Sequence, residues 1–251
     1  MIGIKQTIWM QWLDKAASCV LAGMNVNETR DALHEYLRNP ATPGTYAERS
    51  DETRRFAVNA VMKTWAHPRN ELLAFRDAAL LALRDNRSDA PALHWAIISA
   101  AFPFWYELGR HTGRILTMQN LVTQTQVISR VSDSYGDRQS VSRYGRFIVR
   151  SFVEWGFLAD ADTHGCYQAG PKREVSSPKI LGLLYEAALR ASGAERQSAV
   201  VSLSDPWLFP FLCPAVSSVA SVVDTDRVVV ERYGLNEETL SLATDRGVLR
   251  S

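Results

Sequence analysis

The sequence predicts a mostly α-helical protein with a small α/β region at its C-terminal end. Two observations predict the helical class: apolar residues recur at helical spacing through the first two thirds of the chain, and capping sequences precede several of these stretches. A third observation, a run of three valines from Val228, predicts a strand. We therefore expect a helical bundle over residues 1–90, a second domain over 91–175 and an α/β region over 176–251 packed on that domain.

Length and composition are those of a globular protein. The 251 residues are 46% hydrophobic and 22% charged, which excludes disordered and collagen-like chains. The first residues contain no uninterrupted apolar core ahead of a cleavage site, so we expect no signal peptide. The charge-free run over 206–223 holds three prolines and predicts a buried segment rather than a membrane span. Three widely spaced cysteines fit reduced thiols and a cytoplasmic location.

Capping signals organise the N-terminal helices. Residues 7–24 are largely apolar and predict the first helix. Asn25 and Glu28 have the spacing of a capping box and begin the second. Ser50 is an N-cap candidate for the third, and leucine spacing over 72–86 predicts a fourth.

A further helix is expected to begin with Ser88 as its cap and to run to about Met118. Its first half is free of charge and rich in Trp and Phe, which predicts a central buried helix. Pro103 should bend or break this helix, because proline lacks the amide that an internal helical bond requires.

The middle of the chain carries the strongest signal. Thr123 and Gln126 form a capping box for a helix that ends at Gly136. After a short turn, a second helix is predicted over 140–155. One side of this helix is an apolar stripe, and the opposite side carries three arginines, namely Arg143, Arg146 and Arg150. A strand hairpin is expected over 157–169.

This order of helix, turn, helix and hairpin resembles the winged helix-turn-helix family over about 50 residues. The supporting helix would be 123–136, the recognition helix 140–155 and the wing 157–169. The resemblance implies a recognition helix that enters the major groove of double-stranded DNA. It implies base-edge contacts for Gln139, Ser142 and Arg143, and phosphate contacts for Arg130, Arg138, Arg146, Arg150, Lys172 and Arg173. Asp160 and Asp162 depart from this pattern, because acids in the wing would repel phosphate.

Charge is segregated along the chain. The net charge is only +1, yet residues 110–150 contain seven arginines and two acids. Such a basic stretch is typical of a DNA-binding surface. The same stretch is also compatible with arginines that are simply the solvated face of a helix, or with a winged helix that binds a partner protein as an interaction scaffold. Of the 28 basic residues, 23 are arginine, and the codon preference of GC-rich genomes is an alternative explanation for part of this excess.

The longer order of elements resembles the BrxA-type accessory proteins of BREX phage-defence systems. A helical bundle precedes an apolar helix that contains Trp95 and the sequence Phe102-Pro103-Phe104, and a winged helix follows. The resemblance implies a DNA-binding accessory protein with double-stranded DNA and other defence-system proteins as partners. It implies no membrane, and a homodimer is compatible with it because many winged-helix proteins pair over two half-sites.

The C-terminal region combines a helix and strands. Ser177 and Pro178 predict the start of a helix that ends near Ala191. A strand is expected over 227–233. Asn236, followed by two glutamates, predicts the cap of a last short helix.

No catalytic motif supports an enzyme. The sequence contains no GxxxxGKS or GxxxxGKT phosphate loop, no GxSxG and no HExxH. His111 and Arg114 match the H-x-x-R box of tyrosine recombinases, but the candidate nucleophile Tyr144 falls on the apolar stripe. We therefore expect a non-enzymatic protein without cofactor or metal.

Overall fold

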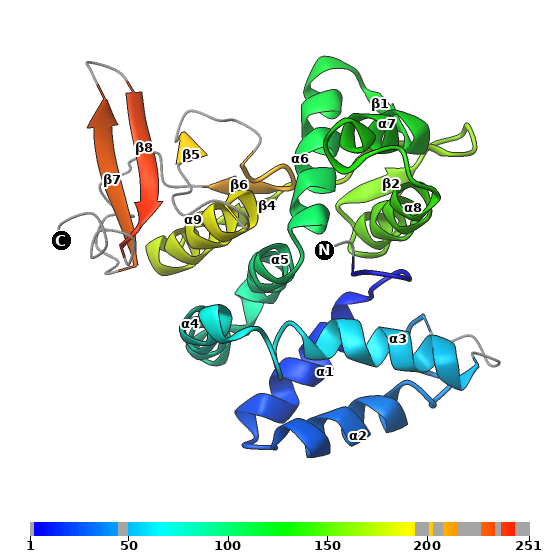
Figure 1. The fold of residues 1–251 in the computed structure, drawn as a ribbon, viewed down its shortest axis with the longest axis vertical. Helices are drawn as coiled ribbons and strands as arrows, with labels where there is room; N and C mark the ends of the chain where they lie inside the picture. The colour runs from blue at the N-terminus through cyan, green and yellow to red at the C-terminus, as the bar shows by residue number, and fades with distance from the viewer. Residues whose placement is uncertain are drawn as a thin grey trace.

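The computed structural model describes residues 3–44, 50–193, 201–202, 208–214, 227–233 and 237–243. The described fold is mostly helical, with three small sheets. Figure 1 shows α1, α2 and α3 together at one end of the molecule, α6, α7 and α8 at the other, and α5 between them. No helix in the described ranges is long and apolar enough to cross a membrane.

The first three helices are α1 (Met10–Leu21), α2 (Val26–Tyr36) and α3 (Asp51–Met62). The predicted capping box is confirmed at α2: Asn25 accepts from the amide of Glu28 at 3.1 Å, and Glu28 accepts from the amide of Asn25 at 2.8 Å. Ser50 caps α3 by accepting from the amide of Thr53 at 3.3 Å. Both caps satisfy amides that have no partner inside the helix.

The next elements are η1 (Asn70–Leu72), α4 (Leu73–Asp85), η2 (Arg87–Asp89), α5 (Ala90–Ala101) and α6 (Pro103–Met118). The predicted break at Pro103 is confirmed, since α5 ends one residue before Phe102 and α6 begins at the proline. The expected cap at Ser88 is wrong. Ser88 lies inside η2, where its own amide donates to the side chain of Asn86 at 3.1 Å. A short helical turn thus precedes α5, and Pro91 lies in the first turn of α5 where no amide is needed.

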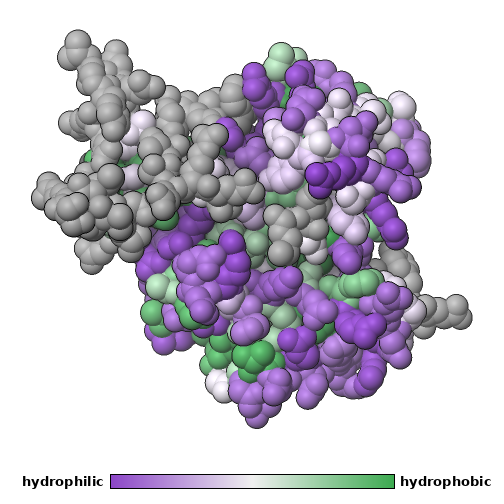
Figure 2. Space-filling model, viewed as in Figure 1, coloured by the Kyte–Doolittle hydropathy of each residue, from purple (hydrophilic) through white to green (hydrophobic). Residues whose placement is uncertain are grey.

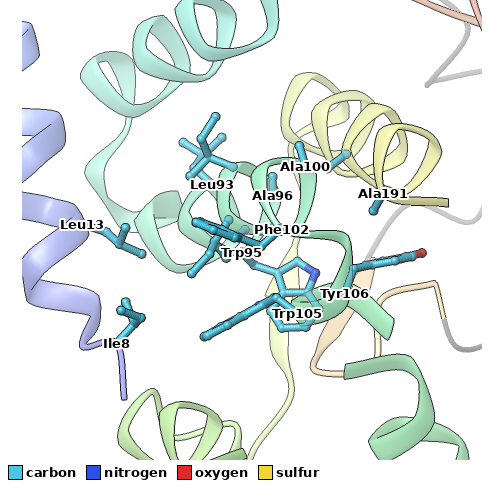
Figure 3. Close-up of a cluster of buried hydrophobic side chains, with 14 of the residues drawn as sticks. Ile8, Leu13, Leu93, Trp95, Ala96, Ala100, Phe102, Trp105, Tyr106 and Ala191 are labelled. Atoms are coloured by element: carbon cyan, nitrogen blue, oxygen red, sulfur yellow. The ribbon is translucent and has the colours of Figure 1, made fainter. Parts of the chain in front are cut away.

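Helix α5 is the centre of the core, with nine of its twelve residues buried. It packs against α1, α4, α6 and α9 (Pro178–Ser192). Figure 3 shows labelled side chains from α1, α5, α6 and α9 around Trp95 and Trp105. Trp95 also contacts Phe152, Phe157 and Phe211, with ring centroids 5.3–5.7 Å apart. One continuous hydrophobic core therefore joins the N-terminal helices to the segment that follows α6.

That segment consists of β1 (Leu121–Thr123), α7 (Gln124–Tyr135), α8 (Gln139–Glu154), β2 (Leu158–Asp160) and β3 (Cys166–Ala169). The three strands form an antiparallel sheet in the order β1-β3-β2. The capping box at α7 is confirmed: Thr123 accepts from the amide of Gln126 at 3.1 Å, and Gln126 accepts from the amide of Thr123 at 2.8 Å. Strand β1 was not predicted, because three residues are too few to show a periodic pattern.

The C-terminal strands are β4 (Arg173–Val175), β5 (Val201–Ser202), β6 (Leu212–Pro214), β7 (Val228–Tyr233) and β8 (Glu237–Leu242). The strand at 228–233 confirms the prediction. The helix expected after Asn236 is wrong, because 237–242 pairs with β7 as an antiparallel strand. Leu240 is buried opposite Val230, so burial against β7 outweighs the capping composition. Of the predicted buried run 206–223, residues 208–212 are buried but Cys213 is exposed, whereas 206–207 and 215–223 lie outside the described residues.

Helix α9 is joined to the strand β7 by a buried carboxylate. Glu186 is 1% exposed and accepts from Arg190 at 2.8 Å and from Arg227 at 2.5 Å. Arg227 directly precedes β7, and its carbonyl accepts from the amide of Ala243 just after β8. The carboxylate thereby fixes the β7–β8 hairpin to α9.

Candidate functional site

Helix α8 has one face in the core and one face in solvent. Val141, Ile148 and Phe152 are buried on the inner face. Gly145 lets α7 approach closely, since a Cβ there would lie 3.1 Å from Ile128. The N-terminal segment fixes the other end of α8: the amide of Ile8 donates to Ser151 at 2.8 Å. These contacts fix the inner face of α8 in the core, and the opposite face is therefore in solvent.

The outer face of α8 is rich in exposed cations. Arg143 and Arg146 are exposed on it, Gln139 lies at its first turn and Arg138 immediately precedes the helix. Ser142 is half-buried at its edge. Within the described ranges, the side chains of these three arginines form no hydrogen bond or ion pair, and Figure 2 shows a mainly hydrophilic surface over α7 and α8. These guanidinium groups are free to bind an anionic partner.

Arg150 lies on the same face but is already paired. Its guanidinium donates to Glu154 at 2.8 Å and to Asp160 of β2 at 2.9 Å. Partial burial lowers the pKa of Arg150, but the hydrogen bonds to the two carboxylates outweigh it and raise the pKa. The sequence predicted a phosphate contact for Arg150. The structure instead gives it two acidic partners, so that it links the last turn of α8 to β2.

The turn between β2 and β3 contributes no cation. Between Asp160 and Gly170 the sequence contains no lysine or arginine, and both Asp162 and His164 are exposed. Gly165 has a φ of +77°, a conformation that favours glycine in this tight turn. The acids noted in the sequence therefore remain at the tip and flank of the hairpin.

Three predicted site residues, Arg130, Lys172 and Arg173, are not on α8. Arg130 lines a cavity of about 460 Å³ with Met118 and other residues of α6 and α7. Lys172 lines a small cavity of about 120 Å³ whose described lining includes no residue of α8. Arg173 donates to the carbonyl of Trp155 at 3.3 Å, just after the end of α8. Six predicted site residues therefore lie on α8 or immediately before it, namely Arg138, Gln139, Ser142, Arg143, Arg146 and Arg150, and the other three lie on other segments.

A cleft that the sequence did not reveal lies beside the outer face of α8. Its volume is about 530 Å³, and we call it the aromatic cleft. Three segments line it: Lys5, Gln6 and Thr7 before α1, Glu52, Thr53 and Phe56 on α3, and Arg143, Tyr144 and Phe147 on α8. In the sequence, the only local indication of this cleft was the position of Phe147 on the flank of the predicted helix. The other segments lie about 90 or more residues away in sequence.

His111 on α6 lies among charged groups. Burial lowers its pKa below the usual 6.5, Glu107 opposes this shift, and three arginines strengthen it, namely Arg110, Arg114 and Arg130. The folded protein therefore holds a proton at His111 less readily than the unfolded chain does. The pKa of His34 is lowered in the same direction, by burial and by Arg38.

We expect these two histidines to make the protein less stable in acid. Because the unfolded chain binds more protons as the pH falls through about 6.5, unfolding becomes more favourable there. Thermal unfolding followed between about pH 7.5 and 5.5 should show a falling midpoint, and His111→Gln should reduce that fall. A midpoint that rises on acidification would contradict the assignment.

Comparisons with protein-family models, with curated proteins and with solved structures find no match. Within the described residues, no group of three His, Cys, Asp or Glu side chains is arranged to hold a metal ion.

Proposed function

We propose that this protein binds double-stranded DNA by placing α8 in the major groove, as a non-enzymatic accessory or regulatory protein. The observation that carries the proposal is the outer face of α8, where Arg138, Arg143 and Arg146 lie exposed without an acidic partner among the described residues. A helix of this diameter fits the major groove, and unpaired arginines suit both guanine edges and phosphates.

The order of elements supports the same proposal. Strand β1, helices α7 and α8, and the hairpin β2–β3 follow one another, and the sheet order is β1-β3-β2. This is the arrangement expected of a winged helix-turn-helix, in which α8 would be the recognition helix and residues 161–165 the tip of the wing.

The residues divide by their position on α8. Gln139 and Ser142 lie in the first turn and Arg143 follows, which suits contacts with base edges. Arg138 and Arg146 flank them and suit phosphates. Arg150 positions the wing through its link to Asp160 rather than contacting DNA itself. In this proposal, the residues at the start of α8 determine which DNA sequence is bound.

The setting of this activity follows from the longer element order. Helices α1 to α6 precede β1, α7 and α8, and a helical bundle ahead of a winged helix is the order that the resemblance to BrxA-type proteins implies. We extend the proposal to an accessory role in a bacterial phage-defence system. A homodimer on two half-sites would fit that role, and sedimentation with and without DNA tests it.

Salt dependence is the first test of DNA binding. If Arg138 and Arg146 each contact a phosphate, the affinity for duplex DNA should fall about tenfold between about 50 and 200 mM salt, because neutralised phosphates release their counterions. Fluorescence anisotropy with a labelled random duplex measures this slope. Binding that is insensitive to salt would contradict a phosphate-based interface.

A protein partner is the second candidate, and a specific observation favours it. Met118 is 80% exposed and lines the cavity between α6 and α7, and Leu121, three residues later, is 43% exposed. Exposed apolar side chains of this size beside a cavity are typical of protein contacts. Two results together would favour this function. The protein would bind no DNA, and it would capture one partner protein at any salt concentration, a capture that Met118→Lys abolishes.

A further inference from the structure

The aromatic cleft adjoins the proposed DNA-binding face and shares a residue with it. Arg143 lies on the outer face of α8 and also lines the cleft. From there the cleft extends along Tyr144 and Phe147 towards α3 and the segment before α1. A DNA chain held by Arg143 would therefore lie at the edge of this cleft. Its volume of about 530 Å³ lies in the ~300–1,000 Å³ range of small-molecule sites.

The lining combines aromatic rings with cations. Phe56, Tyr144 and Phe147 are all half-buried, so part of each ring is left in solvent. The ammonium of Lys5 lies 4.6 Å from the centroid of the Phe56 ring, so the exposed side chain of Lys5 covers one face of this ring. Aromatic faces beside cations are the surfaces on which unpaired nucleotides bind, the bases stacking and the phosphates pairing with the cations.

The carboxylate of Glu52 limits which ligands the aromatic cleft can bind. It is exposed at the wall of the cleft, where its carboxylate would repel a bare phosphate or an acidic peptide. The same carboxylate accepts hydrogen bonds from an amino-bearing base such as cytosine. The lining therefore suits a whole nucleotide, with its base towards Glu52 and the rings and its phosphate towards Lys5.

We propose that the aromatic cleft binds an unpaired nucleotide adjoining the duplex on α8, so that the protein recognises a junction between double-stranded and single-stranded DNA. This inference rests on the proposed function, because α8 must hold the duplex. A base that stacks on Phe56 displaces the ammonium of Lys5, which then pairs with the phosphate of that nucleotide.

The test compares two DNA molecules by fluorescence anisotropy. One is a short blunt duplex, and the other is the same duplex with a tail of about four dC nucleotides on either strand end. We expect at least one tailed form to bind about fivefold tighter or more, the ratio for one stacked base. Phe56→Leu keeps an apolar side chain but removes the flat ring, and should abolish the tail preference while blunt-duplex affinity is unchanged.

Two further variants make the result decisive. Lys5→Ala changes only an exposed side chain, so it folds even if Phe56→Leu does not, and it should reduce the tail preference. Arg146→Ala lies outside the cleft lining and should weaken both DNA molecules equally. Equal affinity of the wild-type protein for blunt and tailed duplexes overturns the inference and leaves the proposed function standing. Binding of neither DNA overturns the proposed function and the inference with it.

Discussion

Replacing Arg138, Arg143 and Arg146 together with alanine is expected to weaken duplex binding by more than about a hundredfold at low salt. Each of the three guanidinium groups is exposed and lacks a partner among the described residues, so its contact with DNA is not offset by the loss of an internal ion pair. Loss of the two phosphate contacts assigned to Arg138 and Arg146 should also lower the salt slope by about 1.8. The anisotropy titration used for the wild-type protein measures both quantities.

A charge-matched variant separates this interface from general electrostatics. Arg38, Arg84 and Arg87 are exposed on other elements, and their joint replacement by alanine removes the same three charges. We expect this control to bind DNA within a few fold of the wild type, since distant exposed charges are screened by salt. Equal losses in the two variants would contradict a site on α8. Unchanged melting temperatures would show that neither variant has unfolded.

The local elements of this chain were predictable from its sequence. The capping boxes at Asn25 and Thr123 and the break at Pro103 depend on residues within four positions of one another, and all three are present as expected. The two faces of α8 follow from helical geometry alone, because the apolar stripe places the arginines opposite it. Neighbouring residues were sufficient for these features.

The partners of the site residues were not predictable. Arg150 has the same spacing as Arg143 and Arg146, yet its charge is compensated because β2 returns beside the last turn of α8 and brings Asp160 next to it. The strand at 237–242 was missed for the same reason, because its pairing with β7 is a tertiary contact that local capping composition does not encode. Likewise the aromatic cleft needs three segments that only the fold brings together.

Loss of the buried carboxylate of Glu186 is expected to destabilise the protein by about 3 kcal/mol. Glu186→Ala leaves Arg190 and Arg227 without their shared acceptor, and breaking a buried ion pair from one side costs about 3–5 kcal/mol. The lower value applies because the arginine side chains are 16% and 29% exposed and regain part of their hydration. For a chain of this length, the melting temperature should fall by about 6–12 °C.

The exposed pair between Lys179 and Asp85 provides the control for this destabilisation. Lys179 also lies on α9, but both side chains are about half exposed, so Lys179→Ala should cost less than about 1 kcal/mol. A loss of similar size in both variants would show that burial of Glu186 adds nothing. Because Glu186 lies on α9 and not on α8, its variant should still bind DNA with wild-type affinity below its melting temperature. The stability of the β7–β8 hairpin and the binding surface of α8 can therefore be changed independently, and a linked loss of both would mean that the C-terminal strands support the site.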